Sequence, residues 1–265
     1  MLTKERLLCI LLIFFSLKGI SQVSSKNWNG KKCAVVLTYD DALDVHLDIV
    51  IPALDSLKMK GTFYLIGSSE NVNRRLNDWR KAAKNGHELG NHSLNHPCDA
   101  SLPGRDFAKG EGDLSKYSVA RTVREIRAAN TLLKAIDGKE KRTFAYPCGD
   151  LKVRDTLFYP QLQNEFSGAR GVTSDYVRIK DADLSNLNAF SQVGSTGEQM
   201  IEQVKQAQKD GTCIVFLFHG VGGGHSLNVA SNEHKKLLNY LAQHRNEIWI
   251  APMVDVAEFL KKAKR

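Results

Sequence analysis

Short apolar runs alternate with longer amphipathic segments along nearly the whole chain. Each short run is bounded by polar residues or glycine, which is typical of a buried strand. The predicted strands span residues 33–39, 62–66, 87–91, 143–146, 170–172, 189–193, 213–218 and 248–250. The segments between them carry apolar residues at helical spacing and predict helices near residues 47–60, 74–85, 118–136, 153–166, 197–209, 231–244 and 253–263.

Strands that alternate with helices favour a parallel sheet in an α/β fold. Seven or eight such units in a chain of 265 residues favour a (β/α) barrel. In barrels of this type the chemistry lies at the carboxyl ends of the strands. The residues directly after each predicted strand are therefore the first candidates for a functional site.

The first residues predict a removable leader. The basic stretch MLTKER precedes an apolar run of 11 residues, LLCILLIFFSL, and small residues follow around Ser21. A membrane-spanning helix needs roughly 20 apolar residues, so this run fits a secretory signal better, an uncleaved anchor being the alternative. We expect a signal peptide at 1–21, a catalytic domain at 22–265, and a secreted (periplasmic or extracellular) protein without stable membrane insertion after cleavage.

Composition adds few constraints. The chain is 42% hydrophobic and 25% charged, as in ordinary globular proteins, and its net charge is +8. The basic residues are scattered, which argues against nucleic acid as a partner, and we expect a monomer. Beyond the leader the cysteines are Cys33, Cys98, Cys148 and Cys213, which allow three pairings. We expect buried thiols at Cys33 and Cys213, and a Cys98–Cys148 bridge is a hypothesis.

A pair of carboxylates follows the first predicted strand. The stretch LTYDDALD places Asp40 and Asp41 at the end of an apolar run. Two like charges at this position raise each other's pKa unless a cation stabilises them. A divalent metal ion could stabilise one aspartate and leave the other free to act as a base.

A pair of histidines follows the strand at 87–91, in the stretch NHSLNHPCD. His92 and His96 are four residues apart, so one helical turn would place them on the same face, and Pro97 would end that turn. Two imidazoles and one carboxylate make a three-ligand metal site with open positions. Surface or core histidines are the alternative, which the neighbouring carboxylate pair makes less favourable.

Two further motifs also lie at strand ends. In RTFAYPCGD, Pro147 and Gly149 predict a tight turn that can direct a backbone N–H into the site. In IVFLFHG, the strand at 214–218 ends in His219, which could be a structural histidine or a catalytic one.

The stretches TYDDALD, HSLNHP, RTFAYPCG and FLFHG occur in this order and resemble the motifs of the polysaccharide deacetylases, the NodB-homology family or carbohydrate esterase family four. The resemblance covers roughly residues 31–262. It implies a distorted (β/α) barrel with about seven parallel strands. It also implies a metal-dependent hydrolase that removes N-acetyl or O-acetyl groups from a polysaccharide or oligosaccharide.

The resemblance further implies a role for each matched residue. Asp40 matches the general base and His219 the general acid. Asp41, His92 and His96 match the ligands of a divalent ion, Zn²⁺ in most members and Co²⁺ or Ni²⁺ in others. The backbone N–H of Cys148 matches the oxyanion-hole donor. We expect Leu217, Tyr146 and Pro147 to line the substrate pocket.

The chain departs from the family pattern in two places. Ala145 stands where the family has an arginine that pairs with the base, and Arg142 lies three residues earlier. An aspartate–tryptophan motif that serves the acid histidine is also missing, although Asp175, Asp181 and Asp183 are available. Two alternatives therefore stay open: a non-catalytic carbohydrate-binding relative, and a non-haem iron oxygenase with a two-histidine, one-carboxylate site.

Overall fold

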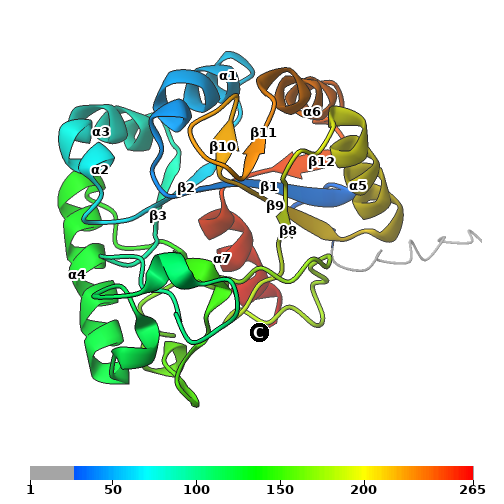
Figure 1. Ribbon diagram of the computed structural model, residues 1–265. Coiled ribbons are helices and arrows are strands. Elements are labelled where there is room, and N and C mark those ends of the chain that lie inside the picture. Colours follow the sequence, from blue (N-terminus) through cyan, green and yellow to red (C-terminus); the bar gives the residue numbers. More distant parts are fainter. Residues whose placement is uncertain (1–26, 265) are drawn as a thin grey trace, which may run out of the picture.

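The computed structural model describes residues 27–264, and the predicted leader at 1–21 lies outside them. Within this range, one sheet follows the order β7-β4-β3-β2-β1-β9-β8, and β12 pairs with the first half of β1 (Figure 1). All of its pairings are parallel. The strands are β1 (Cys33–Asp40), β2 (Thr62–Leu65), β3 (Glu88–Asn91), β4 (Phe144–Ala145), β7 (Ala169–Arg170), β8 (Phe190–Ser191), β9 (Cys213–Phe218) and β12 (Ile248–Ile250).

The sheet forms a distorted half-barrel, as the sequence predicts, and each predicted strand is present. The alternation of side chains in β1 shows how the core is divided. Val35, Leu37 and Tyr39 belong to the larger hydrophobic cluster on one face, while Ala34 and Val36 belong to a second cluster on the other. Because both faces of β1 are buried, its apolar run is continuous rather than alternating.

Six α-helices within residues 27–264 contribute buried side chains to the larger cluster, among them Leu54, Val72, Trp79, Leu133, Val204 and Leu237. They are α1 (Ile51–Ser56), α3 (Leu76–Lys84), α4 (Val119–Asp137), α5 (Gly197–Asp210) and α6 (Ser231–Gln243), with the short α2 (Glu70–Arg74) beside α3. Helix α7 (Met253–Ala263) packs on the opposite face through Met253, Val256 and Leu260. Figure 1 shows the strands between these two groups of helices. No helix within residues 27–264 is long and apolar enough to cross a membrane.

The helix predicted at 153–166 is wrong. The segment forms a hairpin of β5 (Lys152–Val153) and β6 (Thr156–Leu157), followed by a 3₁₀ turn at Tyr159–Gln161. Arg154 adopts a φ of 53° in the hairpin, and Pro160 cannot donate an intrahelical hydrogen bond. Phe158, Leu162 and Phe166 recur four residues apart because they all pack into one aromatic cluster.

A buried histidine gives the fold a predictable response to acid. His234 on α6 lies against the Tyr39 hydroxyl at 2.8 Å, and burial lowers its pKa to about 4. The unfolded chain takes up this proton near pH 6.5, so the stabilisation is present above pH 6.5 and is lost as the pH falls towards 4. For the wild-type protein we expect His234 to contribute about 2–3 kcal/mol to the loss of unfolding free energy between pH 7.5 and pH 4.5.

This expectation can be checked by urea unfolding of wild type and His234→Gln at the two pH values. The difference in unfolding free energy between pH 7.5 and pH 4.5 should be smaller by that amount in the variant. An equal difference in the two proteins would contradict the assignment.

Candidate active site

The two aspartates at the end of β1 point to different partners. Asp40 is the last residue of the strand and is 3% exposed, while Asp41 leaves the strand with a φ of 78°. The N–H of Asp41 donates to the carbonyl of Tyr64 at 3.1 Å, which fixes this turn against β2. A positive φ at a non-glycine residue is strained, so contacts with neighbouring residues must hold the turn that separates the two carboxylates.

Asp40 forms a buried ion pair with Arg170 of β7. The Arg170 Nη2 lies 2.5 Å from Asp40 Oδ2, Nη1 donates to the carbonyl of Gly171, and the guanidinium lies 5.0 Å from the ring centre of Tyr64. Arg142 instead pairs with Asp137 and donates to the carbonyl of Leu89. Arg170, which lies on another strand, thus pairs with Asp40 in place of the arginine that is missing at position 145. The available signal was an arginine within an otherwise apolar predicted strand.

Asp41 faces the two predicted histidines. Its Oδ1 lies 3.5 Å from His92 Nε2 and 3.6 Å from His96 Nε2, and the three ligand atoms are within 4.8 Å of one another. His92 Nδ1 donates to the carbonyl of Ala145 at 2.9 Å, which leaves the Nε2 lone pair free. Asp41 Oδ1 is buried without a hydrogen-bond partner. This donor set fits a divalent cation such as Zn²⁺.

The histidine pair does not lie on a helical turn, contrary to the prediction. Ser93 and His96 have φ values of 62° and 51°, which no helix contains. The N–H of Ser93 donates to Asn91 Oδ1, and that of His96 donates to Ser93 Oγ. These two side-chain turns still bring the rings of His92 and His96 to 4.6 Å between centres.

Burial and neighbouring charges hold His96 and Asp41 in forms suited to metal binding. Burial lowers the pKa of His96 to about 4, and its ring is therefore neutral at pH 7. Burial by itself raises the pKa of Asp41, but its interactions with the imidazoles of His92, His96 and His219 outweigh burial, so this pKa lies well below its usual range. A neutral imidazole beside an ionised carboxylate is what a metal ion requires of its ligands.

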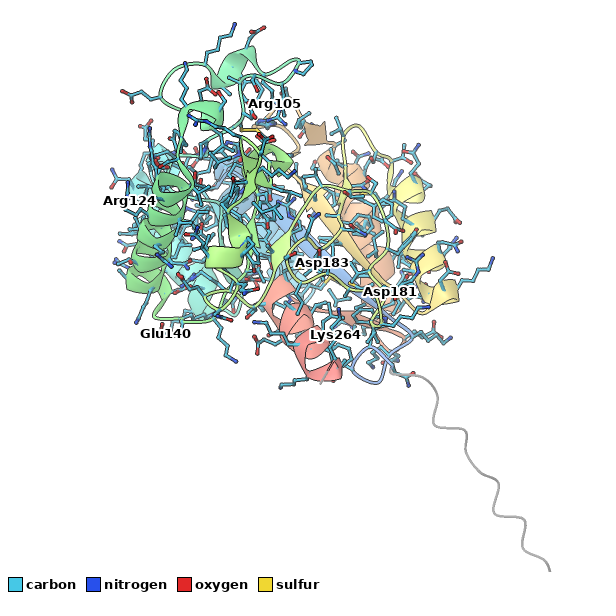
Figure 2. All side chains as sticks on the ribbon, turned by 90° about the horizontal axis from the view of Figure 1, so that it is seen from below. Arg105, Arg124, Glu140, Asp181, Asp183 and Lys264 are labelled. Carbon is cyan, nitrogen blue, oxygen red and sulfur yellow. A yellow bond between two sulfur atoms is a disulfide. The ribbon has the colours of Figure 1, made fainter. Side chains whose placement is uncertain are left out.

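The Cys98–Cys148 bridge is confirmed, with a sequence separation of 50 between its cysteines, and Cys33 and Cys213 are free and buried as predicted. The bridge ties the loop that carries His96 to the turn at Pro147–Gly149. Cys148 has a φ of 54° in this turn, and Arg105 donates to its carbonyl at 3.1 Å. Figure 2 shows Arg105 beside this part of the chain. Both loops are therefore fixed relative to each other.

Removal of the bridge is expected to destabilise the protein. A cross-link that closes a loop of 50 residues restricts the unfolded chain by about 4 kcal/mol. Cys98→Ser should therefore lower the unfolding free energy by up to about 4 kcal/mol in urea titrations. Dithiothreitol should reproduce this loss in wild type and change nothing further in the variant. A variant as stable as oxidised wild type would contradict the expectation.

His219 follows β9, and its Nε2 lies 3.9 Å from Asp41 Oδ2. Its carbonyl accepts a hydrogen bond from His46 Nε2 at 2.8 Å, and burial lowers the pKa of the His219 ring. The Nδ1 of His219 is buried without a hydrogen-bond partner. The three aspartates considered as its partner interact elsewhere: Asp175 with Arg178, Asp181 with Lys180, and Asp183 with Ser185.

The predicted pocket residues lie near the site at different depths. Leu217 precedes His219 by two residues in β9 and is 2% exposed in the second hydrophobic cluster. Pro147 is buried in the turn that contains Cys148. Tyr146 packs its ring on Phe144 and donates its hydroxyl to the carbonyl of Ser185 at 2.7 Å. Its ring is thus part of the aromatic core, and the pocket roles stay predictions.

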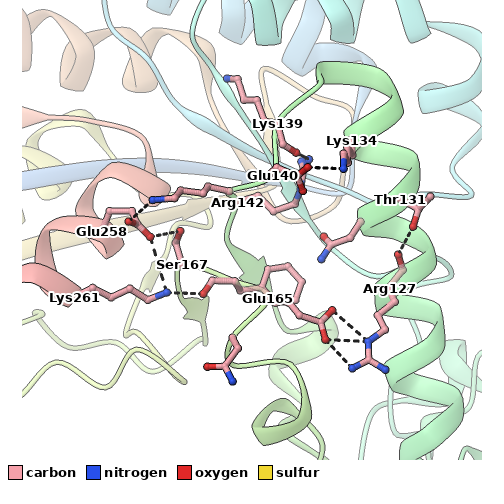
Figure 3. A pocket seen from close by; sticks show the side chains of 14 residues that line it. Arg127, Thr131, Lys134, Lys139, Glu140, Arg142, Glu165, Ser167, Glu258 and Lys261 are labelled. Carbon is pink, nitrogen blue, oxygen red and sulfur yellow. Dashed lines mark hydrogen bonds and ion pairs between the residues drawn. The ribbon is translucent and has the colours of Figure 1, made fainter.

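A cavity of about 630 Å³ lies at the other end of the strands, before β4 and β7. It is lined by many charged side chains that pair with one another (Figure 3). Arg127 pairs with Glu165 at 2.7 Å, and Lys141 with Glu258 at 2.9 Å. Its position away from the strand ends that carry Asp40 and His219 separates it from the candidate site.

The fold is a distorted (β/α) half-barrel with acidic and imidazole side chains at its strand ends, and the family match places it among hydrolases of carbohydrates. The sequence model of the family described as polysaccharide deacetylase matches residues 27–163, about half of the chain. The chain belongs to the polysaccharide deacetylase family.

Two curated bacterial proteins match shorter segments. A peptidoglycan-N-acetylglucosamine deacetylase of Bacillus cereus is 41% identical over 69 residues, which are 25% of this chain and 24% of that protein. Protein YlxY of Bacillus subtilis is 31% identical over 107 residues, 40% of this chain and 28% of that protein. The chain thus spans about a quarter of the length of these relatives.

Solved structures share the fold over most of the chain. A candidate polysaccharide deacetylase from Mycobacterium smegmatis has a TM-score of 0.65 at 14% identity, covering 91% of this chain and 94% of that one. The peptidoglycan N-acetylglucosamine deacetylase Bc1960 has a TM-score of 0.57 at 18% identity, covering 87% and 90%. At these identities the likeness establishes the fold alone.

Proposed function

We propose that this protein is an exported, metal-dependent hydrolase that releases acetate from an acetylated glycan. The observation that carries the proposal is the convergence of Asp41, His92 and His96 between the Arg170-paired Asp40 and His219. The scissile bond is the amide of an N-acetylhexosamine or the ester of an O-acetylated sugar.

In this proposal Asp41, His92 and His96 hold the ion. When bound, the divalent ion, most simply Zn²⁺, supplies a Lewis acid for the acetyl carbonyl and lowers the pKa of a bound water. Co²⁺ and Ni²⁺ are the alternatives. The neutral ring of His96 and the free Nε2 of His92 provide the lone pairs that such an ion needs.

The remaining residues move protons and stabilise charge. Asp40 accepts a proton from the attacking water, and Arg170 fixes the orientation of its carboxylate. The N–H of Cys148 donates to the oxyanion that develops on the acetyl group. His219 gives a proton to the leaving amine or alkoxide, and its pKa, lowered by burial, makes its protonated form a stronger acid.

Two features support export. The apolar leader of the sequence has the length of a secretory signal, and the Cys98–Cys148 bridge is typical of oxidising compartments. The curated relative from Bacillus cereus acts on peptidoglycan N-acetylglucosamine by its name, so N-acetylated cell-wall glycans are the first substrates to test.

The structure bears on the two alternatives. The missing arginine was one of the two arguments for a non-catalytic carbohydrate-binding relative, and the Asp40–Arg170 pair removes it. A non-haem iron oxygenase has no need of a buried base or of His219, so both of these residues favour the hydrolase.

The test is to purify the chain without residues 1–21, measure its metal content by mass spectrometry, and assay acetate release from chitooligosaccharides and acetylated xylan. We expect one bound divalent ion and acetate release that chelation abolishes and added Zn²⁺ restores. Glycan binding without acetate release would favour the non-catalytic relative. Iron-dependent oxygen consumption would favour the oxygenase. Either outcome would overturn the proposal.

A further inference from the structure

The loop after His219 returns a second imidazole to the site. It joins β10 (Gly220–Val221) to β11 (Asn228–Val229), which pair with each other. Gly222, Gly223 and Gly224 have φ values of 72°, 128° and 81°, which side chains other than glycine rarely adopt. The consecutive positive φ values turn the chain sharply, so that the next residue, His225, lies beside His219.

Close packing holds this loop in place. A Cβ on Gly220 would lie 2.4 Å from the carbonyl oxygen of Gly223, and a Cβ on Gly224 would lie 2.9 Å from Val45, which follows the two aspartates in the chain. The N–H of Gly223 donates a hydrogen bond to Asn228 Oδ1 at 2.8 Å. The loop is therefore held in a defined position beside the site.

His225 stacks on His219 with 5.0 Å between ring centres and 18° between ring planes. Its Nε2 lies 4.0 Å from Asp41 Oδ2, the oxygen that also faces His219 Nε2. The two rings thus present their Nε2 atoms side by side towards the same space. The side chain of His225 is 32% exposed, so a bound molecule can reach it.

The tautomer of His225 follows from the hydrogen bond that one of its ring nitrogens accepts. The N–H of Leu227 donates to His225 Nδ1 at 3.0 Å. Because Nδ1 is an acceptor, the ring proton is on Nε2, which makes Nε2 a hydrogen-bond donor. A donor at this atom cannot also offer a lone pair to a metal ion, and the metal ligands use the other oxygen of Asp41.

We propose that His225 is a substrate-binding residue, whose Nε2–H donates a hydrogen bond to a sugar oxygen on the leaving-group side of the acetyl group. The stack with His219, the proposed acid, places this donor where the sugar must lie when it receives a proton. The inference rests on the proposed function and extends it with a residue outside the four sequence motifs. The ligand group is a hydroxyl or ether oxygen of a carbohydrate.

Two substitutions separate hydrogen bonding from ring packing. His225→Phe keeps a ring to stack on His219 but loses the donor, and His225→Gln loses the ring but keeps an amide donor. In an Asp40→Asn background, calorimetry with a chitooligosaccharide should show affinity about tenfold weaker for His225→Phe, and His225→Gln should recover most of that loss. In the protein that keeps Asp40, kcat/KM should fall in His225→Phe and recover most of that loss in His225→Gln. Ser226→Ala, exposed on the same loop, is the control and should match its parent.

Each other outcome would count against the proposal. Normal affinity in His225→Phe with a loss in His225→Gln would assign the residue to ring packing. Loss of the metal ion in both variants would make it a ligand, and unchanged affinity in both would leave it without a role. Acetate release by wild type with unaffected variants overturns this inference alone, while a wild type that releases no acetate overturns the proposed function with it.

Discussion

Replacing Asp40 with asparagine is expected to lower kcat for acetate release by 10²–10⁴-fold, the range that a general base contributes. The amide cannot accept the proton of the attacking water at neutral pH. The metal content should stay that of wild type, because Asp41, His92 and His96 keep their donor atoms. The measurement is acetate release under saturating substrate, together with metal analysis of the same preparation.

The matched control is Asp44→Asn. Asp44 lies in the same stretch, but its side chain is 42% exposed and pairs with Arg74 at 2.7 Å and with Arg75 at 3.3 Å, so its loss should leave kcat within about twofold. Equal rates in wild type and Asp40→Asn would remove Asp40 from the mechanism. A fall in metal content would instead assign Asp40 to the metal site, since its Oδ2 lies 3.8 Å from His92 Nε2.

Replacing Arg170 with leucine is expected to lower the free energy of unfolding by about 3–5 kcal/mol, because Asp40 would be left as a buried, unpaired charge. The two side chains are 0% and 4% exposed, so water cannot replace the lost partner. Urea unfolding at pH 7 measures this loss. The exposed Arg124 on α4 is the control, and Arg124→Leu should change stability by less than about 0.5 kcal/mol.

A double-mutant cycle tests whether the loss of the Asp40–Arg170 ion pair causes the lower free energy of unfolding. In the Arg170→Leu background, Asp40→Asn should stabilise the protein, since it removes the unpaired charge; alone it should destabilise, since it leaves the guanidinium unpaired. Additive effects of the two substitutions would mean that the ion pair does not account for the loss.

The sequence predicts this fold well because its strongest signals are local. Strands β1 and β9 contain continuous apolar runs, at residues 33–37 and 213–218. In a parallel barrel every strand ends at the same side, so Asp40, His92 and His219 could be placed together before any contact was known. The prediction failed at 153–166 because side chains spaced four residues apart also suit an irregular segment that covers an aromatic cluster.

The residues that were missed depend on contacts between distant segments. Arg170 meets Asp40 across 130 positions of sequence, and no local pattern specifies which arginine closes such a gap. His225 was missed because a glycine-rich stretch does not reveal its path until the φ values are known. The disulfide was one of three pairings, and only the approach of the two loops selects it.

The position of Arg170 also indicates how strongly the sheet is curved. Strand β7 is four places from β1 in the sheet order, and neighbouring strands are about 4.8 Å apart, so a flat sheet would hold the two strands about 19 Å from each other. The contact between Arg170 and Asp40 is thus possible only because the sheet curves and brings the side chains of β7 and β1 together across the half-barrel. A change that flattens the arc would therefore separate the guanidinium of Arg170 from the carboxylate of Asp40. The curvature of the sheet and the state of the base are therefore set by the same contact.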